Sequence, residues 1–266
     1  MRAARAVAAA WSLLTILPLP RSVSRRLEAS DWARCGAAFP LVGLALGLLV
    51  AAIAHVGIDL LGTEAGAAVA VIASAILTAG LHLDGLADCA DALGARGSGE
   101  AQRRRRLDIL RDSATGAYGA LALISALLLQ TTTIASLSLA GATGMVVALT
   151  LALPLARTAG VVHAALLLPA RRSGLGASFA VSRGALITAL VGALLITGAI
   201  SAAWVVDQHE LRGLAEPVAA LVGAAVAVAV TTRLAAAKLG GRTGDTIGAT
   251  IVLAETLALL GFLAAR

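Results

Sequence analysis

Charged residues are scarce in this chain of 266 residues: Asp, Glu, Lys and Arg together make up 14% of it, whereas about 25% is usual in soluble domains. Hydrophobic residues account for 59%, and the mean hydropathy is +0.91. The alternating pattern of a membrane β-barrel is also missing, because the apolar runs are continuous and rich in alanine, leucine, valine and glycine. The sequence therefore predicts an all-α fold, a polytopic membrane helical bundle that forms a single domain over residues 1–266.

Cysteine and aromatic residues are few as well, and each shortage excludes a class of protein. Two cysteines, Cys35 and Cys89, are too few and too scattered for a disulfide framework or a zinc site. Aromatic residues make up 3%, which leaves little for base stacking, so we attribute the net charge of +6 to membrane orientation and expect no nucleic acid partner. No Gly-x-Ser-x-Gly, Walker A or His-Glu-x-x-His pattern occurs, so the sequence gives hydrolase, ATPase and zinc-enzyme functions no support.

Seven apolar runs are long enough to cross a bilayer, which takes roughly 20 residues per helix. They cover residues 36–56, 65–82, 117–137, 141–168, 184–206, 217–236 and 247–265. Residues 6–20 form a further apolar segment, which is short for a span and is not followed by a small-x-small cleavage site. We therefore expect about seven transmembrane helices and a retained N-terminal helix that is re-entrant or interfacial.

Basic residues gather in alternate loops, and this predicts the orientation in the membrane. Apart from Arg157, Arg212 and Arg266, every Lys and Arg lies in one of four segments, 1–35, 83–116, 169–183 and 233–246. The positive-inside rule places these segments in the cytoplasm. We expect a multi-pass protein of the cell (inner) membrane with its N-terminus inside, its C-terminus outside and its unusual loops on the cytoplasmic face.

The stretch from His82 to Asp91 carries three carboxylates, those of Asp84, Asp88 and Asp91, at spacings of four and three residues. On an α-helix this spacing places all three on one face, where like charges repel. A divalent cation such as Mg²⁺ would turn that repulsion into coordination, because hard cations bind carboxylate oxygens and leave room for phosphate. The alternative is a solvated acidic turn at the membrane boundary. His82, two residues before the first carboxylate, is a candidate for a substrate contact.

The remainder of this polar segment, up to residue 116, mixes aspartates with arginines beside glycines, a combination that suits a metal–phosphate site. Arg111 and Asp112 are its better candidates, because they stand in a glycine-rich turn that enters the next span. For Arg103–Arg106 we favour the simpler interpretation, an anchor on anionic membrane lipid.

A second glycine-rich turn, residues 238–248, enters the last span. Its backbone amides could cradle an anion, with Thr243 as a hydroxyl donor and with Arg242 and Asp245 beside it. A third basic, glycine-containing segment lies at 171–179.

Arg157 and Glu255 lie within apolar spans, where a charge is costly unless it faces the bundle interior or a polar cavity. Both are therefore candidate functional residues. The alternative for Arg157 is a structural pair with Glu255.

Four motifs together resemble the cobalamin synthase family, also called adenosylcobinamide-GDP ribazoletransferase. They read His-Leu-Asp-Gly-Leu-Ala-Asp-x-x-Asp at 82–91, Ile-Leu-Arg-Asp-Ser-x-x-Gly-x-Tyr-Gly at 109–119, Gly-Leu-Gly-x-x-Phe at 174–179 and Gly-Gly-x-Thr-Gly-Asp-Thr-x-Gly-Ala at 240–249. The resemblance implies an inner-membrane, Mg²⁺-dependent enzyme that joins adenosylcobinamide-GDP to α-ribazole or its 5′-phosphate. Adenosylcobalamin, or its 5′-phosphate, and GMP would be the products.

With this resemblance, we hypothesise roles for the candidate residues. Asp84, Asp88 and Asp112 are the first-choice Mg²⁺ ligands, and Asp91 is a ligand or the general base. Asp245 would complete the metal or ribose site, and Arg111 and Arg242 would neutralise the pyrophosphate. The full set of candidates for substrate binding is His82, Arg111, Arg157, Arg242, Thr243, Asp245 and Glu255.

Two other functions stay open. A membrane phosphotransferase with a CDP-alcohol donor would place a spaced-Asp motif in the same position, although its usual Asp-Gly-x-x-Ala-Arg continuation is missing after Asp84. A small-molecule transporter would use Arg157 and Glu255 on its path. For the corrinoid enzyme, the partners that we consider besides substrates and membrane lipid are a second copy of this chain and other corrinoid-assembly enzymes.

Overall fold

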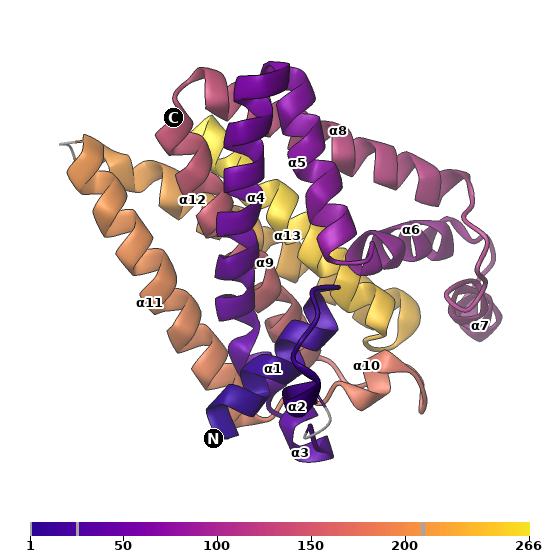
Figure 1. The fold of residues 1–266 in the computed structure, drawn as a ribbon. Coiled ribbons are helices and arrows are strands. Elements are labelled where there is room, and N and C mark those ends of the chain that lie inside the picture. Colours follow the sequence, from indigo (N-terminus) through magenta and orange to yellow (C-terminus); the bar gives the residue numbers. More distant parts are fainter. Residues whose placement is uncertain (1, 25–26, 209–210) are drawn as a thin grey trace.

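The computed structural model describes residues 2–24, 27–208 and 211–266, and their regular elements are helices (Figure 1). Among these residues, six helical segments are long and apolar enough to cross a membrane. They are α4 with the turn before it (Cys35–Leu61), α8 (Ala117–Leu139), α9 (Ala142–Leu166), α11 (Arg183–Gln208), α12 with the turn after it (Ala215–Leu239) and α13 (Gly244–Ala264). The predicted polytopic helical bundle is confirmed.

The span predicted over 65–82 is broken in the structure. Helix α5 (Thr63–Leu77) ends early, and α6 (Leu81–Gly94) starts after a turn and lies at 90° to it. The turn places Ala79 at φ 53° and Gly80 at φ 66°, left-handed values that an α-helix cannot continue through. Counted as one broken span, the pair brings the total to the expected seven. The bend turns α6 out of the direction of α4 and α5 (Figure 1).

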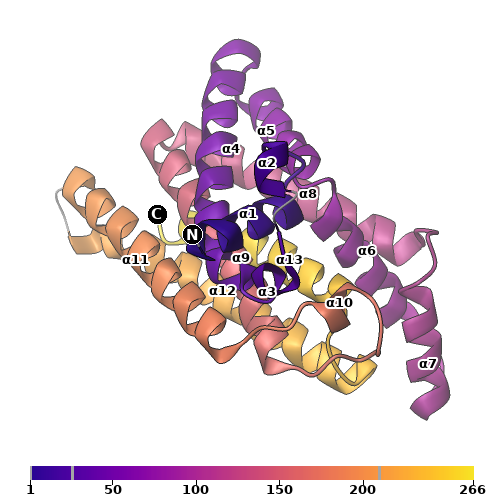
Figure 2. The same ribbon diagram turned by 60° about the horizontal axis from the view of Figure 1, so that its bottom comes forward.

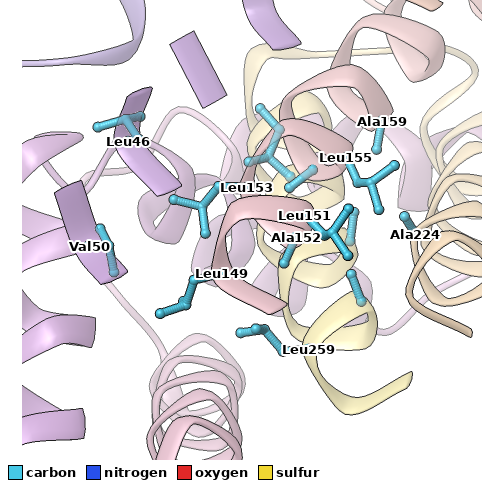
Figure 3. Close-up of a cluster of buried hydrophobic side chains, with 14 of the residues drawn as sticks. Leu46, Val50, Leu149, Leu151, Ala152, Leu153, Leu155, Ala159, Ala224 and Leu259 are labelled. Carbon is cyan, nitrogen blue, oxygen red and sulfur yellow. The ribbon is translucent and has the colours of Figure 1, made fainter. Parts of the chain in front are cut away.

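Helix α9 is the centre of the bundle, and 83% of its most apolar stretch of 18 residues is buried. It packs against α4, α11, α12 and α13. Figure 3 shows leucines of α9, such as Leu149 and Leu153, between Leu46 of α4 and Leu259 of α13. Helices α8 and α11 lie at the outside of the bundle, and most of their apolar stretches are not buried within it.

The N-terminal helix is shorter than expected. Helix α1 (Arg2–Leu14) packs against α4, α3 (Ala29–Trp32) and η1 (Cys35–Ala38), and residues 15–20 are not helical. It is too short to be a span. Its C-terminal end brings Leu13 and Leu14 to the cavities described below.

The remaining elements are short and lie mainly at one end of the bundle. They are α2 (Arg21–Ser24), α7 (Gly99–Ile109), α10 (Leu175–Ser178), η2 (Leu211–Leu214) and η3 (Ala235–Leu239). In Figure 1 helices α1, α2, α3 and α10 gather at the lower end with the N-terminus, whereas the C-terminus and the α4–α5 turn are at the upper end. Figure 2 brings the lower end forward and shows α10 beside the start of α13.

A buried ion pair lies inside the bundle, between Arg157 of α9 and Glu255 of α13. Their side chains are 1% and 11% exposed. Beside them, Gln130 Nε2 donates to Thr256 Oγ1 at 2.9 Å. The structural pairing considered for Arg157 is therefore present, and it explains how both charges are accommodated in apolar spans.

Removing one partner of this pair should destabilise the protein strongly. For Arg157→Met we expect a loss of about 3–5 kcal/mol in the free energy of unfolding, because Glu255 would be left as an uncompensated buried charge. The double variant Arg157→Met/Glu255→Met should recover most of that loss. Thermal unfolding in detergent compares the three proteins. A double variant as unstable as the single one would contradict this explanation.

Candidate active site

Helix α6 carries Asp84, Asp88 and Asp91, so the predicted helical setting of the three carboxylates is confirmed. The helix crosses the start of α13 at unusually short range. A Cβ atom on Gly85 would lie 2.7 Å from the carbonyl oxygen and 3.0 Å from the Cα of Asp245. Only glycine permits this approach, and it brings Asp245, which is 160 positions away in the chain, beside the α6 carboxylates.

The carboxylates lie close enough to interact electrostatically. The negative charge of Asp84 acts on the carboxylate of Asp88. The charges of Asp245 and Asp91 act in the same direction, and Arg171 opposes them. Asp84 itself is exposed, and Asp88 is half-buried. The chain therefore concentrates negative charge at a position that solvent and ligands can reach.

Arg171 is the cation of this cluster, and our sequence-based site assignment missed it. Its Nη2 donates to Asp245 Oδ2 at 3.1 Å, and the two side chains are 16% and 23% exposed. Arg171 follows α9 in a loop that pairs with the turn before α13, where Ala170 N donates to Arg242 O at 2.9 Å. The basic, glycine-containing segment at 171–179 was the available signal, but the sequence did not show what it contacts.

Arg242 has a structural role, and the pyrophosphate contact stays a prediction. Its guanidinium is buried and donates to three backbone carbonyls: Nε to Gly176 at 3.0 Å, Nη2 to Phe179 at 3.1 Å, and Nη1 to Leu167. Each nitrogen is thus already engaged. The arginine therefore holds the α10 loop against the start of α13.

Thr243 likewise supports the start of α13. It is buried, its hydroxyl accepts from Thr246 N at 3.2 Å, and its own N donates to Thr246 Oγ1 at 2.9 Å, which is a capping box. His163 Nε2 lies 3.0 Å from the same Thr246 hydroxyl. The hydroxyl of Thr243 therefore helps to orient Asp245 through the helix that carries it, and its predicted substrate contact stays a prediction.

Asp91 accepts two backbone hydrogen bonds from the segment that starts α8. Its Oδ2 accepts from Gly116 N at 2.7 Å and its Oδ1 from Gly119 N at 2.9 Å, so it anchors the N-terminus of α8. A carboxylate is favourable there because it satisfies free amides and faces the positive end of the helix dipole. Asp91 therefore has an anchoring role, and its role as metal ligand or general base stays a prediction.

The predicted metal set of Asp84, Asp88 and Asp112 is not preassembled. Asp112 is exposed, and its Oδ1 accepts from Ala114 N at 3.1 Å within its own loop. Arg111 beside it is exposed as well. Throughout the part of the chain that the structure describes, no group of three or more His, Cys, Asp or Glu side chains is arranged to hold a metal ion.

His82 lies on the inner side of α6. It is 6% exposed, and its Nε2 is buried with no hydrogen-bond partner. The ring lines two small cavities, one shared with Asp84 and Asp245, the other with Arg157 and Glu255. It therefore lies between the carboxylate cluster and the buried ion pair.

Cavities of different character meet at the carboxylates. One of about 200 Å³ lies on the side of Arg171 and is lined by polar and small residues, among them Ser173, Gly174 and Gly244. Another of about 600 Å³ reaches Asp84 from the side of α1, the α5–α6 turn and α8, and its lining is largely apolar. The carboxylates thus stand where a polar ligand group and an apolar one could meet.

Comparison with known proteins identifies the family. The chain matches Cobalamin-5-phosphate synthase over residues 6–263. It belongs to this family. Proteins named adenosylcobinamide-GDP ribazoletransferase are its relatives: that of Azorhizobium caulinodans is 37% identical over 97% of this chain and 94% of its own length. Those of a Sinorhizobium species and Citrobacter koseri are 39% and 35% identical over at least 95% of either chain. No solved structure matches.

Membership of the Cobalamin-5-phosphate synthase family confirms the resemblance seen in the four motifs and makes the chain a transferase of cobalamin synthesis. Its long apolar helices make it a multi-pass membrane protein. Within that family setting, the structure brings together Asp84, Asp88 and Asp245 with Arg171. It gives Arg242, Thr243 and Asp91 supporting positions around them.

Proposed function

We propose that this chain joins adenosylcobinamide-GDP to α-ribazole or its 5′-phosphate, and releases GMP with adenosylcobalamin or its 5′-phosphate. The observation that carries the proposal is the crossing at Gly85, which places carboxylates from two distant segments at one accessible point. In the reaction, a ribazole hydroxyl oxygen bonds to the phosphorus that bears the corrinoid arm, and the bond from that phosphorus to GMP breaks. One hydroxyl proton is released for each GMP formed.

We further propose that Mg²⁺ is the cofactor, with Asp84 and Asp88 as ligands and Asp245 in the place first assigned to Asp112. The donor set fits, because these are hard oxygen ligands of one charge, and the cation beside them, Arg171, contacts Asp245. Mg²⁺ commonly uses one or two carboxylates and completes its coordination with water and substrate phosphates, so a preassembled cage is not required. When bound, the metal supplies charge neutralisation at the diphosphate.

The remaining work of this chain is positioning. Gly85 and the capping box at Thr243 hold α6 and α13 at the distance that the carboxylates need. The carbonyl contacts of Arg242 keep the α10 loop, with Arg171 nearby, against that crossing. Such rigid support matters, because reactions between bound groups lose rate steeply when the groups are displaced. The site would face the cytoplasm of the inner membrane, as the basic segments predict.

One assay tests the proposal. Purified protein in detergent is given adenosylcobinamide-GDP and α-ribazole, with Mg²⁺ or with a chelator, and GMP release is measured. We expect release with Mg²⁺ and only background with the chelator. Release that is indifferent to the chelator would remove the metal from the mechanism. Release of CMP from a CDP-alcohol, without release of GMP from the corrinoid donor, would establish the alternative phosphotransferase.

The anchoring role of Asp91 gives a separate prediction. In Asp91→Ala the first turn of α8 loses the acceptor for Gly116 and Gly119, so the free energy of unfolding should fall by about 1–2 kcal/mol, as for other lost helix caps. GMP release should fall much less than in variants of Asp84. Thermal unfolding and the GMP assay on the same preparation separate the two effects. Unchanged stability with complete loss of turnover would return Asp91 to the chemistry.

A further inference from the structure

The cavity of about 200 Å³ beside Arg171 has the character of an anion site. Its lining includes Arg171, Ser173, Gly174, Gly176 and Gly244. The guanidinium offers paired donors in a planar fork that matches phosphate oxygens. Small residues leave backbone amides accessible, and the hydroxyl of Ser173 adds a further donor. A cavity lined by two arginines, Arg171 and Arg242, therefore adjoins the carboxylate cluster.

The start of α13 contributes to the same cavity. Thr243, Gly244 and Asp245 line it, and they open a helix of 21 residues. The free amides and dipole of such a helix favour negative charge at its N-terminus. The cavity thus combines the side-chain cation of Arg171 with a backbone contribution from the start of α13.

The two arginines nearest to Arg171 in the chain or in the cavity make different contacts. Arg242 also lines the cavity, but its three nitrogens donate to the carbonyls of Leu167, Gly176 and Phe179. Arg172 is exposed and is not part of the lining. Only Arg171 has a partner that a ligand could replace, because its contact with Asp245 is a single hydrogen bond between partly exposed side chains.

We propose that this cavity binds the phosphates of the guanosine diphosphate moiety of the donor, and that Arg171 exchanges its bond to Asp245 for a bond to phosphate. This inference rests on the proposed function, because it names the subsite for the donor. A phosphate oxygen offers the guanidinium a stronger, bidentate partner than the single contact it has now. The exchange also frees the Asp245 carboxylate toward Asp84 and Asp88 at the moment the donor is bound.

The test measures GDP binding by calorimetry on purified full-length protein in detergent, without acceptor and therefore without turnover. Arg171→Ala should weaken GDP binding by about tenfold or more, as expected for loss of a charge-assisted hydrogen bond, and Arg171→Lys should weaken it less. Arg172→Ala is the matched control, since it removes the same charge from the adjacent position and should stay within about twofold. Equal effects of the two alanine variants, or no GDP binding by the unaltered protein, would overturn the proposal.

Arg171→Ala combined with Asp245→Asn distinguishes phosphate binding by Arg171 from mere support of Asp245. In Asp245→Asn the ion pair is already lost, so Arg171→Ala should still weaken GDP binding by a similar factor if the arginine contacts phosphate. No further effect in that background would show that Arg171 acts only through Asp245. If Arg171→Ala does not fold, as judged by size exclusion and thermal unfolding, Arg171→Gln carries the same comparison.

The subsite and the proposed function can fail separately. GDP binding that depends on Arg171, in a protein that releases no GMP from the corrinoid donor, would leave the subsite intact and contradict the reaction. GMP release by the unaltered protein, with GDP binding indifferent to Arg171, would contradict the subsite alone.

Discussion

Asp84→Asn is expected to lower GMP release by about a thousandfold or more while the protein still inserts and folds. Asparagine keeps the size of the side chain but removes the negative charge, and several kcal/mol of metal-mediated charge stabilisation depend on that charge. Asp84 is exposed, so its replacement should cost little stability. Turnover is measured with saturating Mg²⁺, and folding is followed by thermal unfolding in detergent.

The control for this variant is Asp108→Asn, an exposed carboxylate on α7 in the same polar segment. It should keep nearly full activity. Substantial activity in Asp84→Asn would contradict the metal assignment.

Asp112→Asn decides between the two proposed sets of metal ligands. A loss of activity as large as that of Asp84→Asn, without a similar loss in Asp245→Asn, would favour the set that we first predicted from the sequence.

Gly85→Ala is the second variant with a large expected effect, although it adds a single methyl group. That group would lie 2.7 Å from the carbonyl oxygen of Asp245, so α6 and α13 would have to move apart. A displacement approaching 1 Å between groups that act together can cost about a hundredfold in rate. We therefore expect a fall in GMP release of that order, with the helical content unchanged by circular dichroism.

Gly198→Ala is the matched control. It lies within α11, where an added Cβ would meet nothing within 4 Å. Both substitutions favour the helical state by a similar small amount, so any difference between them reports on the crossing alone. If both variants were fully active, the close approach of α6 and α13 would not matter to the reaction.

Much of the membrane architecture could be predicted from the chain alone, because it follows from local physical requirements. A continuous apolar run must form a helix in a bilayer, so the spans near 117–137 and 141–168 correspond to α8 and α9. The same reasoning missed the break at Gly80, since hydropathy measures solubility in lipid and says nothing about a left-handed turn. The helical spacing of Asp84 and Asp88 was likewise a local property, and it was predicted correctly.

The partners of the polar residues could not be predicted in this way. An arginine in a glycine-rich turn can bind a phosphate or satisfy carbonyls, and Arg242 does the latter because the loop over 167–179 folds against it. The sequence did not show that Asp91 anchors α8, because the amides of Gly116 and Gly119 that it accepts from lie 25 and 28 positions away. Such choices depend on which distant segments meet, and no single segment contains that information.

The sequence by itself determined that this is a helical membrane protein, that its motifs are those of the Cobalamin-5-phosphate synthase family, and that a carboxylate face lies on the helix after the second span. Only the tertiary structure decided which groups join that face. Asp245 reaches it through the missing side chain of Gly85, and Arg171 reaches it through a loop held by the carbonyl contacts of Arg242. The reason is physical: helix type and burial follow from short-range chemistry, whereas a site made from three segments exists only once the helices have packed.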